Sequence, residues 1–138
     1  MDKRVLRIMD ANINRAKEGL RVIEDFVRFV MDDKELSEEL KKLRHEISLN
    51  IMDYLEILSS RDSEGDVGIR IKLESENRRE DLKDIIISNF KRCQESLRVL
   101  EEFSKLYDIN LSGNFKKLRY KAYQLEKGIL IKGSEGLW

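Results

Sequence analysis

The chain has 138 residues, a length that suits one domain with a sizeable core, and 39% of them are charged. Lys plus Arg total 27 and Asp plus Glu total 27, so the formal net charge is zero. This balance argues against general binding to nucleic acid or to a membrane surface, because both partners favour an excess of basic residues.

No apolar run reaches the ~18 residues of a membrane-spanning helix, and no signal peptide is visible. The one cysteine, Cys93, has no partner for an internal disulfide and stands within a helical pattern. That position indicates a buried structural thiol. We therefore expect a reducing, cytoplasmic setting.

The first two helices are expected over residues 3–31 and 34–58, with Asp2 as the first N-cap. Both carry an apolar stripe with a period near 3.6. The first stripe is Val5, Ile8, Ala16, Gly19, Ile23, Phe26 and Val30, with Asn12 in the middle of it, and the second is Leu36, Leu40, Leu43, Ile47, Tyr54 and Leu58.

Residues 59–79 are predicted to form a long central loop. This stretch exceeds the ~2–8 residues usual between bundle helices, and loops over ~12–15 residues are usually functional or disordered. Ile69, Ile71 and Leu73 alternate with basic residues, which suits a short extended segment.

Two further helices are expected over residues 79–107 and 113–132. Asn89 interrupts the apolar stripe of the third helix, as Asn12 does in the first. The tail 133–138 is expected to be loose, with Trp138 available to dock on a neighbouring molecule.

The helices repeat in sequence. Residues 12–26 return 77 positions later as residues 89–103, and residues 36–44 return as 111–119 with an offset of 75. A repeat of this kind indicates that one structural unit occurs twice in the fold. The prediction is a single all-α domain over 1–138, an antiparallel four-helix bundle built from two helical hairpins. Repeat 1 covers 3–58, the central loop 59–79 and repeat 2 80–132.

The copies keep polar residues that core packing alone would not retain. The matched positions are Asn12, Arg15, Glu18, Leu20, Arg21, Val22, Glu24 and Phe26, which become Asn89, Arg92, Glu95, Leu97, Arg98, Val99, Glu101 and Phe103. Arg21 and Arg98 have acidic residues within helical reach, so local ion pairs are expected there, with a subunit interface as a second constraint.

Asn12 and Asn89 admit two interpretations. They satisfy each other or fix helix register in a dry core, or one of the amides reads the edge of a heterocyclic ligand held between helices. Arg15 and Arg92 flank the stripes, where they are either phosphate ligands or surface ion-pair partners.

The loop segment 61–68 is the best chemical candidate by spacing alone. Arg61 offers a fork for phosphate, the glycines let backbone N–H groups approach an anion, and Asp62 and Asp66 are candidate Mg²⁺ ligands. The alternative is an ordinary solvated turn. His45 is the sole histidine and makes neither a metal site nor a catalytic triad by itself.

Four motifs occur in order along the chain: Met9-Asp10-Ala11-Asn12-x-Asn14-Arg15-Ala16-x-Glu18-Gly19-Leu20-Arg21-Val22-x-Glu24-Asp25, Leu43-Arg44-His45, Ser60-Arg61-Asp62-x-x-x-Asp66-Val67-Gly68, and Asn89-x-x-Arg92-x-x-Glu95-Ser96-Leu97-Arg98-Val99-Leu100-Glu101-Glu102. Together they resemble the small hydroxymethylpyrimidine phosphate kinase family, often fused ahead of thiamine phosphate synthase. No synthase domain follows Trp138, so the resemblance implies the stand-alone form.

The resemblance implies transfer of the γ-phosphoryl group of ATP to hydroxymethylpyrimidine phosphate in thiamine synthesis, with Mg²⁺. Arg61, Arg15 and Arg92 are then the catalytic candidates. Asn12, Asn89, Asn14, His45 and Gly68 are the substrate-binding candidates, and Asp62, Asp66 and Asp10 the metal candidates.

Two rival functions stay open. One is a non-catalytic helical module that docks on or regulates thiamine phosphate synthase, and the other is a plain oligomerising bundle. The expected partners are the pyrimidine phosphate and ATP, with a functional link to the synthase. The oligomeric state is left open.

Overall fold

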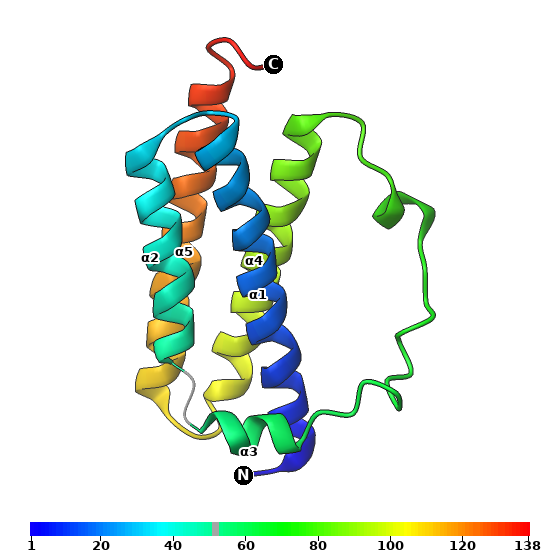
Figure 1. Cartoon of the computed structure of the whole chain (residues 1–138). Coiled ribbons are helices and arrows are strands. Elements are labelled where there is room, and N and C mark those ends of the chain that lie inside the picture. Colours follow the sequence, from blue (N-terminus) through cyan, green and yellow to red (C-terminus); the bar gives the residue numbers. More distant parts are fainter. Residues whose placement is uncertain (51–52) are drawn as a thin grey trace.

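The structure is a computed structural model that describes residues 1–50 and 53–138, without the side chain of residue 75. It has the α-helices α1 (Lys3–Phe29), α2 (Lys34–Leu49), α3 (Tyr54–Ser59), α4 (Leu82–Ser104) and α5 (Ile109–Gly133), and the short 3-10 helix η1 (Glu74–Asn77). Helices α1, α2, α4 and α5 form an antiparallel bundle in which α1 packs on α2 and α4, and α5 packs on α4 and α2 (Figure 1). The predicted all-α fold is confirmed.

An aspartate precedes every α-helix in the part of the chain that the structure describes. Its carboxylate accepts a backbone N–H of the first turn at 2.7–3.0 Å. Such a cap typically stabilises a helix by about 1 kcal/mol. These caps are Asp2, Asp33, Asp53, Asp81 and Asp108. They move the start of the third long helix from residue 79 to 82 and that of the fourth from 113 to 109.

The expected single helix over 34–58 is wrong, because α2 ends at Leu49. The Asn50 side chain donates to the Glu46 carbonyl at 2.8 Å, and Asp53 caps a new helix, α3, which lies across the end of the bundle (Figure 1). Tyr54, assigned to the apolar stripe, is exposed, and Ile57 is buried instead. Residues 51–52 of the expected helix lie outside the described residues.

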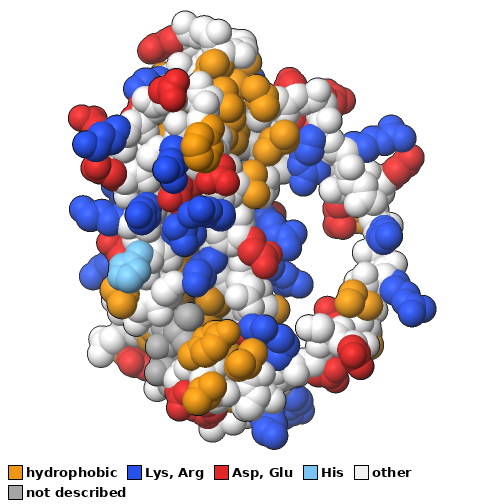
Figure 2. All heavy atoms as spheres, in the orientation of Figure 1, with side chains coloured by type: hydrophobic (Ala, Val, Ile, Leu, Met, Phe, Trp, Pro, Cys, Tyr) orange, Lys and Arg blue, Asp and Glu red, His pale blue; other side chains and the backbone are white. Residues whose placement is uncertain are grey.

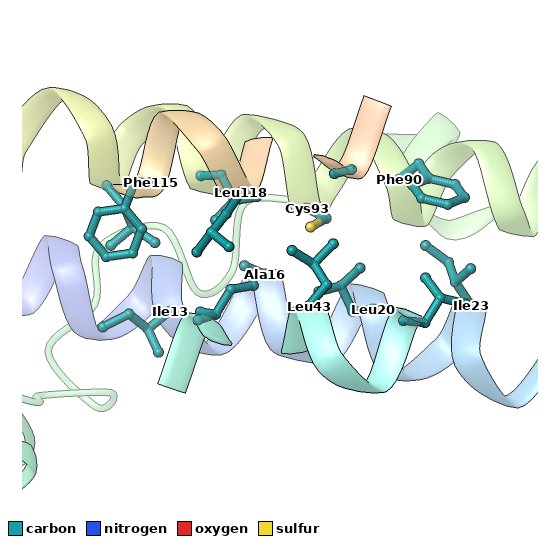
Figure 3. Close-up of a cluster of buried hydrophobic side chains, with 14 of the residues drawn as sticks. Ile13, Ala16, Leu20, Ile23, Leu43, Phe90, Cys93, Phe115 and Leu118 are labelled. Atoms are coloured by element: carbon teal, nitrogen blue, oxygen red, sulfur yellow. The ribbon is translucent and has the colours of Figure 1, made fainter. Parts of the chain in front are cut away.

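The core is made by the stripes of all four long helices. Figure 3 shows Ile13, Leu20 and Ile23 of α1 facing Phe90 and other side chains of α4 and α5. Cys93 is fully buried there, and burial raises the pKa of its thiol to about 12. The prediction of a buried thiol is confirmed.

Helices α1 and α4 approach closely at small residues. A Cβ added to Gly19 would lie 3.0 Å from the backbone oxygen of Asn89, so a larger residue would push the helices apart. The residue of α4 equivalent to Gly19 is Ser96.

The C-terminal tail folds back onto its own bundle. Trp138 stacks on Phe26 with ring centroids 5.8 Å apart, and a Cβ on Gly133 would clash with the indole ring. Trp138 therefore docks on its own chain, not on a neighbour as expected above.

Each hairpin is held by a buried ion pair that the sequence analysis missed. Glu24 of α1 accepts from Arg44 of α2 at 3.0 Å, and Glu101 of α4 pairs with Arg119 of α5 at 3.1 Å. Arg21 and Arg98 add the expected local pairs to the same carboxylates. Burial raises the pKa of Glu101, but Arg98 and Arg119 outweigh burial and the net shift is downward. The sequence did contain a signal for these ion pairs, because Arg44 and Arg119 are equivalent residues of the repeat at the offset of 75.

Candidate functional site

Part of the repeated polar set lines one cavity of about 730 Å³ between α1 and α4, which we call the repeat cavity. Ten of its lining residues form five repeat-equivalent pairs. These pairs are Asn12/Asn89, Arg15/Arg92, Glu18/Glu95, Gly19/Ser96 and Val22/Val99. The α1–α4 crossing therefore places both copies of the repeated asparagine, arginine and first glutamate on one surface.

The two asparagines make the same contact in each helix. The amide nitrogen of Asn12 donates to the Ile8 carbonyl, and that of Asn89 to the Ile85 carbonyl, both at 2.8 Å. Neither amide bonds to the other, and no hydrogen bond reaches either side-chain oxygen from the described residues. Each oxygen is therefore left for another donor.

Arg15 and Arg92 are exposed at the rim of the repeat cavity. Within the described residues no carboxylate lies in ion-pair range of either guanidinium. The interpretation as surface ion-pair partners is thus wrong for both residues. An unpaired guanidinium can offer its full fork of donors to a phosphate.

A second cavity of about 650 Å³, which we call the loop cavity, adjoins the first and shares Asn12, Arg15 and Val99 with it. It lies between the first half of α1 and the start of the central loop. Its polar lining also includes Arg4, Arg7, Asp10, Asn14, Arg61, Asp62, Ser63 and Asp66. The two cavities together form one groove.

The loop is joined to α1 by a two-point ion pair. Arg61 donates to both carboxylate oxygens of Asp10, at 2.8 and 2.7 Å, and Asp10 is buried. This contact raises the pKa of Arg61. Asn14 donates to the same carboxylate at 3.4 Å, and Arg7 donates to the Asp62 carbonyl at 3.3 Å. The break at Asn50 makes this possible, because α3 carries the chain to the first half of α1.

Of the three metal candidates, Asp10 is engaged by Arg61, which leaves Asp62 and Asp66. Each forms a turn in which one carboxylate oxygen accepts a backbone N–H, of Gly65 and of Gly68 respectively, at 2.9 Å. The described residues contain no cluster of three or more metal-ligating side chains. Two carboxylates still suit Mg²⁺, because this ion usually takes one or two together with waters and substrate phosphates.

Two predicted substrate-binding residues lie elsewhere. His45 is exposed on α2 and lines neither cavity, and Gly68 stands on the exposed part of the loop. The structure brings together the other nine candidates: Arg61, Arg15, Arg92, Asn12, Asn89, Asn14, Asp62, Asp66 and Asp10.

The rest of the loop stands off the bundle. Val67 is 94% exposed, and Ile69 and Ile71 form no strand in the described part of the chain. Figure 2 shows open space between the loop and the bundle, with Lys and Arg side chains along the edge of the bundle that faces it. Sequence reasoning missed Arg4, Arg7, Arg79 and Lys91 at this groove.

None of the helices in the described residues combines the length and the hydrophobicity that a membrane crossing needs.

Three relatives show where the chain has counterparts. It is 41% identical over 126 residues to a thiamine-phosphate synthase of Nostoc punctiforme, covering 91% of this chain and 35% of that protein. It is 41% identical to a thiamine-phosphate synthase of Synechocystis sp., covering 91% of this chain and 36% of that protein. It is 38% identical to a thiamine-phosphate synthase of Rhodopirellula baltica, covering 93% of this chain and 35% of that protein. The chain thus spans about a third of the length of these relatives, and the stand-alone form stays a prediction.

No solved structure gives a significant match. The model of the ThiD2 family matches residues 7–128. This range includes α2, α4, most of α1 and most of α5, together with every residue of the groove except Arg4. The chain therefore belongs to the ThiD2 family.

Proposed function

We propose that this chain acts in thiamine biosynthesis as a hydroxymethylpyrimidine phosphate kinase, with ATP as donor and the groove as active site. The observation that carries the proposal is the repeat cavity, which is lined by both copies of an Asn–Arg–Glu set. The two arginines of this set have no carboxylate partner among the described residues. The relatives named thiamine-phosphate synthase support the pathway.

The proposed reaction asks little of a base. The acceptor is a phosphate monoester, which is largely dianionic at pH 7 because its second pKa is about 6. One of its oxygens attacks the γ-phosphorus of ATP, the bond from that phosphorus to the β–γ bridging oxygen breaks, and ADP leaves. Catalysis then depends on positioning the two phosphates and on compensating their charge.

The chain supplies that charge at the junction of the two cavities. Arg15 lines both cavities, Arg92 lines the repeat cavity from α4, and Arg61 is held at the loop cavity by Asp10. The open forks of Arg15 and Arg92 allow two negatively charged phosphates to approach, and Arg61, whose fork is bound to Asp10, fixes the loop beside them. Asp62 and Asp66 would hold Mg²⁺, which neutralises charge on the nucleotide phosphates when it is bound.

The pyrimidine would be read by the two asparagines. An exocyclic amine on the ring is a donor, and the side-chain oxygens of Asn12 and Asn89 are acceptors that the described residues leave without a partner. His45 and Gly68 have no part in this mechanism, because they lie outside the groove.

The test is ADP release by the purified protein with hydroxymethylpyrimidine phosphate, ATP and Mg²⁺. We expect turnover with the phosphate and none with the free alcohol, because the site is built around the acceptor phosphate. Arg61→Ala should lower kcat/KM by about a hundredfold. No turnover by folded wild-type protein would reject the kinase proposal, and wild-type kcat/KM in Arg61→Ala would remove the loop from the mechanism.

A second candidate is a non-catalytic helical domain that works with thiamine-phosphate synthase. The observation in its favour is that the chain aligns with about a third of proteins that carry that name. This function predicts a complex with the synthase, or a changed synthase rate, in the absence of ATP. Turnover of the monophosphate by the isolated chain would make catalysis its primary role.

A further inference from the structure

The two halves of the groove differ, although the helices that build it repeat. Around the repeat cavity the equivalent residues match, but toward the helix N-termini they reverse in charge. Arg4 and Arg7 of α1 correspond to Asp81 and Asp84 of α4 at the same offset of 77. Asp10, which holds Arg61, corresponds to Ile87, so the second half has no equivalent of that ion pair.

The acidic pair at the start of α4 serves the backbone. Asp81 caps the helix by accepting from the Asp84 N–H at 2.7 Å, and Asp84 accepts from the Glu80 N–H at 3.2 Å. Neither lines the repeat cavity or the loop cavity. Anionic ligands are repelled by such a pair, so a second polyphosphate would not be accommodated at this end.

The corresponding end of α1 carries arginines that line a cavity. Arg4 and Arg7 line the loop cavity beside Arg61, and the only hydrogen bond that Arg7 makes within the described residues goes to the neutral carbonyl of Asp62. Asp62 and Asp66 line the same cavity. The guanidinium of Arg4 is paired with Asp2 at 2.8 Å and that of Arg61 with Asp10, so Arg7 is the arginine left open at this end. An open arginine fork next to two carboxylates suits a metal-bound polyphosphate.

We propose that the loop cavity is the polyphosphate site of the nucleotide, with Arg7 as a binding residue, and that the repeat cavity takes the single-phosphate acceptor. This inference rests on the proposed function, because it divides the same groove between the two substrates. Arg15, shared by both cavities, then lies where donor and acceptor phosphates meet.

The experiment measures binding by calorimetry with two separate probes: Mg²⁺ with a non-hydrolysable ATP analogue, and hydroxymethylpyrimidine phosphate. Arg7→Asp copies the charge found at the equivalent position of α4, and Arg7→Gln removes the charge with less perturbation. Lys3→Asp is the matched control, because Lys3 is exposed on the same helix, carries the same charge and lines neither cavity.

We expect Arg7→Asp to raise the Kd for the nucleotide analogue about tenfold or more, with a change below about twofold for the pyrimidine phosphate. Arg7→Gln should give a smaller loss of the same kind, and Lys3→Asp should leave both affinities near wild type. An unchanged nucleotide Kd in both Arg7 variants, selective loss of the pyrimidine phosphate, or a wild-type protein that binds no nucleotide would overturn the inference.

These outcomes are separable from failure of the proposed function. Selective loss of nucleotide binding in a protein that releases no ADP would reject the kinase activity and keep the site assignment. Normal turnover with an unchanged KM for ATP in Arg7→Asp would keep the kinase and reject the assignment.

Discussion

Two sets of polar residues are repeated in both halves of this molecule, and they differ in burial and in their protein partners. Glu24 and Glu101 are buried and closed by Arg44 and Arg119 of the neighbouring helix. The groove set, represented by Arg15 and Arg92, lies open and is unpaired within the described residues. Repetition of a polar residue therefore indicates a constraint without saying which one, and the presence or absence of a protein partner separates architecture from ligand binding.

The largest expected effect comes from breaking a hairpin ion pair. Glu101→Ala should lower the free energy of unfolding by about 3 kcal/mol, because it leaves the Arg119 guanidinium poorly solvated and without its carboxylate. Urea unfolding followed by circular dichroism measures this. The exposed neighbour Glu102 makes surface pairs only, so Glu102→Ala should cost about 0.5 kcal/mol. Equal effects of the two substitutions would show that the buried ion pair does not stabilise the hairpin more than a surface pair does.

Removing the groove arginines should give the opposite pattern. Arg92→Ala and Arg15→Ala should each lower kcat/KM by about a hundredfold and leave the free energy of unfolding within about 0.5 kcal/mol of wild type. Steady-state kinetics and urea unfolding of the same samples test both halves. Arg28→Ala, on α1 but outside the groove, is the control. A stability loss as large as that of Glu101→Ala would place these arginines in the architecture instead.

The smallest effect concerns the crossing that brings the two copies together. Gly19→Ala should destabilise by about 1 kcal/mol, because its Cβ meets the Asn89 backbone oxygen at 3.0 Å and the overpacking exceeds the gain in helix propensity. Gly128→Ala in α5 meets nothing within 4 Å and should stabilise by about 0.8 kcal/mol. Thermal unfolding of both variants provides the comparison, and the same sign for both would argue against a tight α1–α4 contact.

Much of the fold follows from local pattern. The 3.6-residue period of the apolar stripes predicted the four long helices, and the doubled hairpin motif predicted their antiparallel bundle. The break between α2 and α3 was missed because Leu58 continues the apolar stripe of Leu43 and Ile47. Asn50 and Asp53 end one helix and begin the next through their side-chain hydrogen bonds, and the sequence does not show that these bonds form. Trp138 was misplaced because the stacking partner, Phe26, is far away in the sequence.

The candidate site was predicted in part for the same reason. The sequence repeat identified four of the site residues, Asn12, Asn89, Arg15 and Arg92. The spacing of charged residues and glycines in the central loop identified Arg61. No motif or repeat distinguishes the other basic residues of the groove, and only their position in the structure identifies them. These residues are Arg4, Arg7, Arg79 and Lys91. His45 belonged to a motif of the resembled family but lies on α2, which does not line the groove.

By itself, the amino-acid sequence determined what depends on short-range order: helix periodicity, the duplication, the buried thiol and the family. Tertiary structure alone decided which distant groups meet, such as Asp10 with Arg61 across 51 positions, and which of the repeated polar residues line a common groove. The reason is that such meetings depend on where helices cross and where a chain breaks, and both are set by packing and capping contacts between groups far apart along the chain.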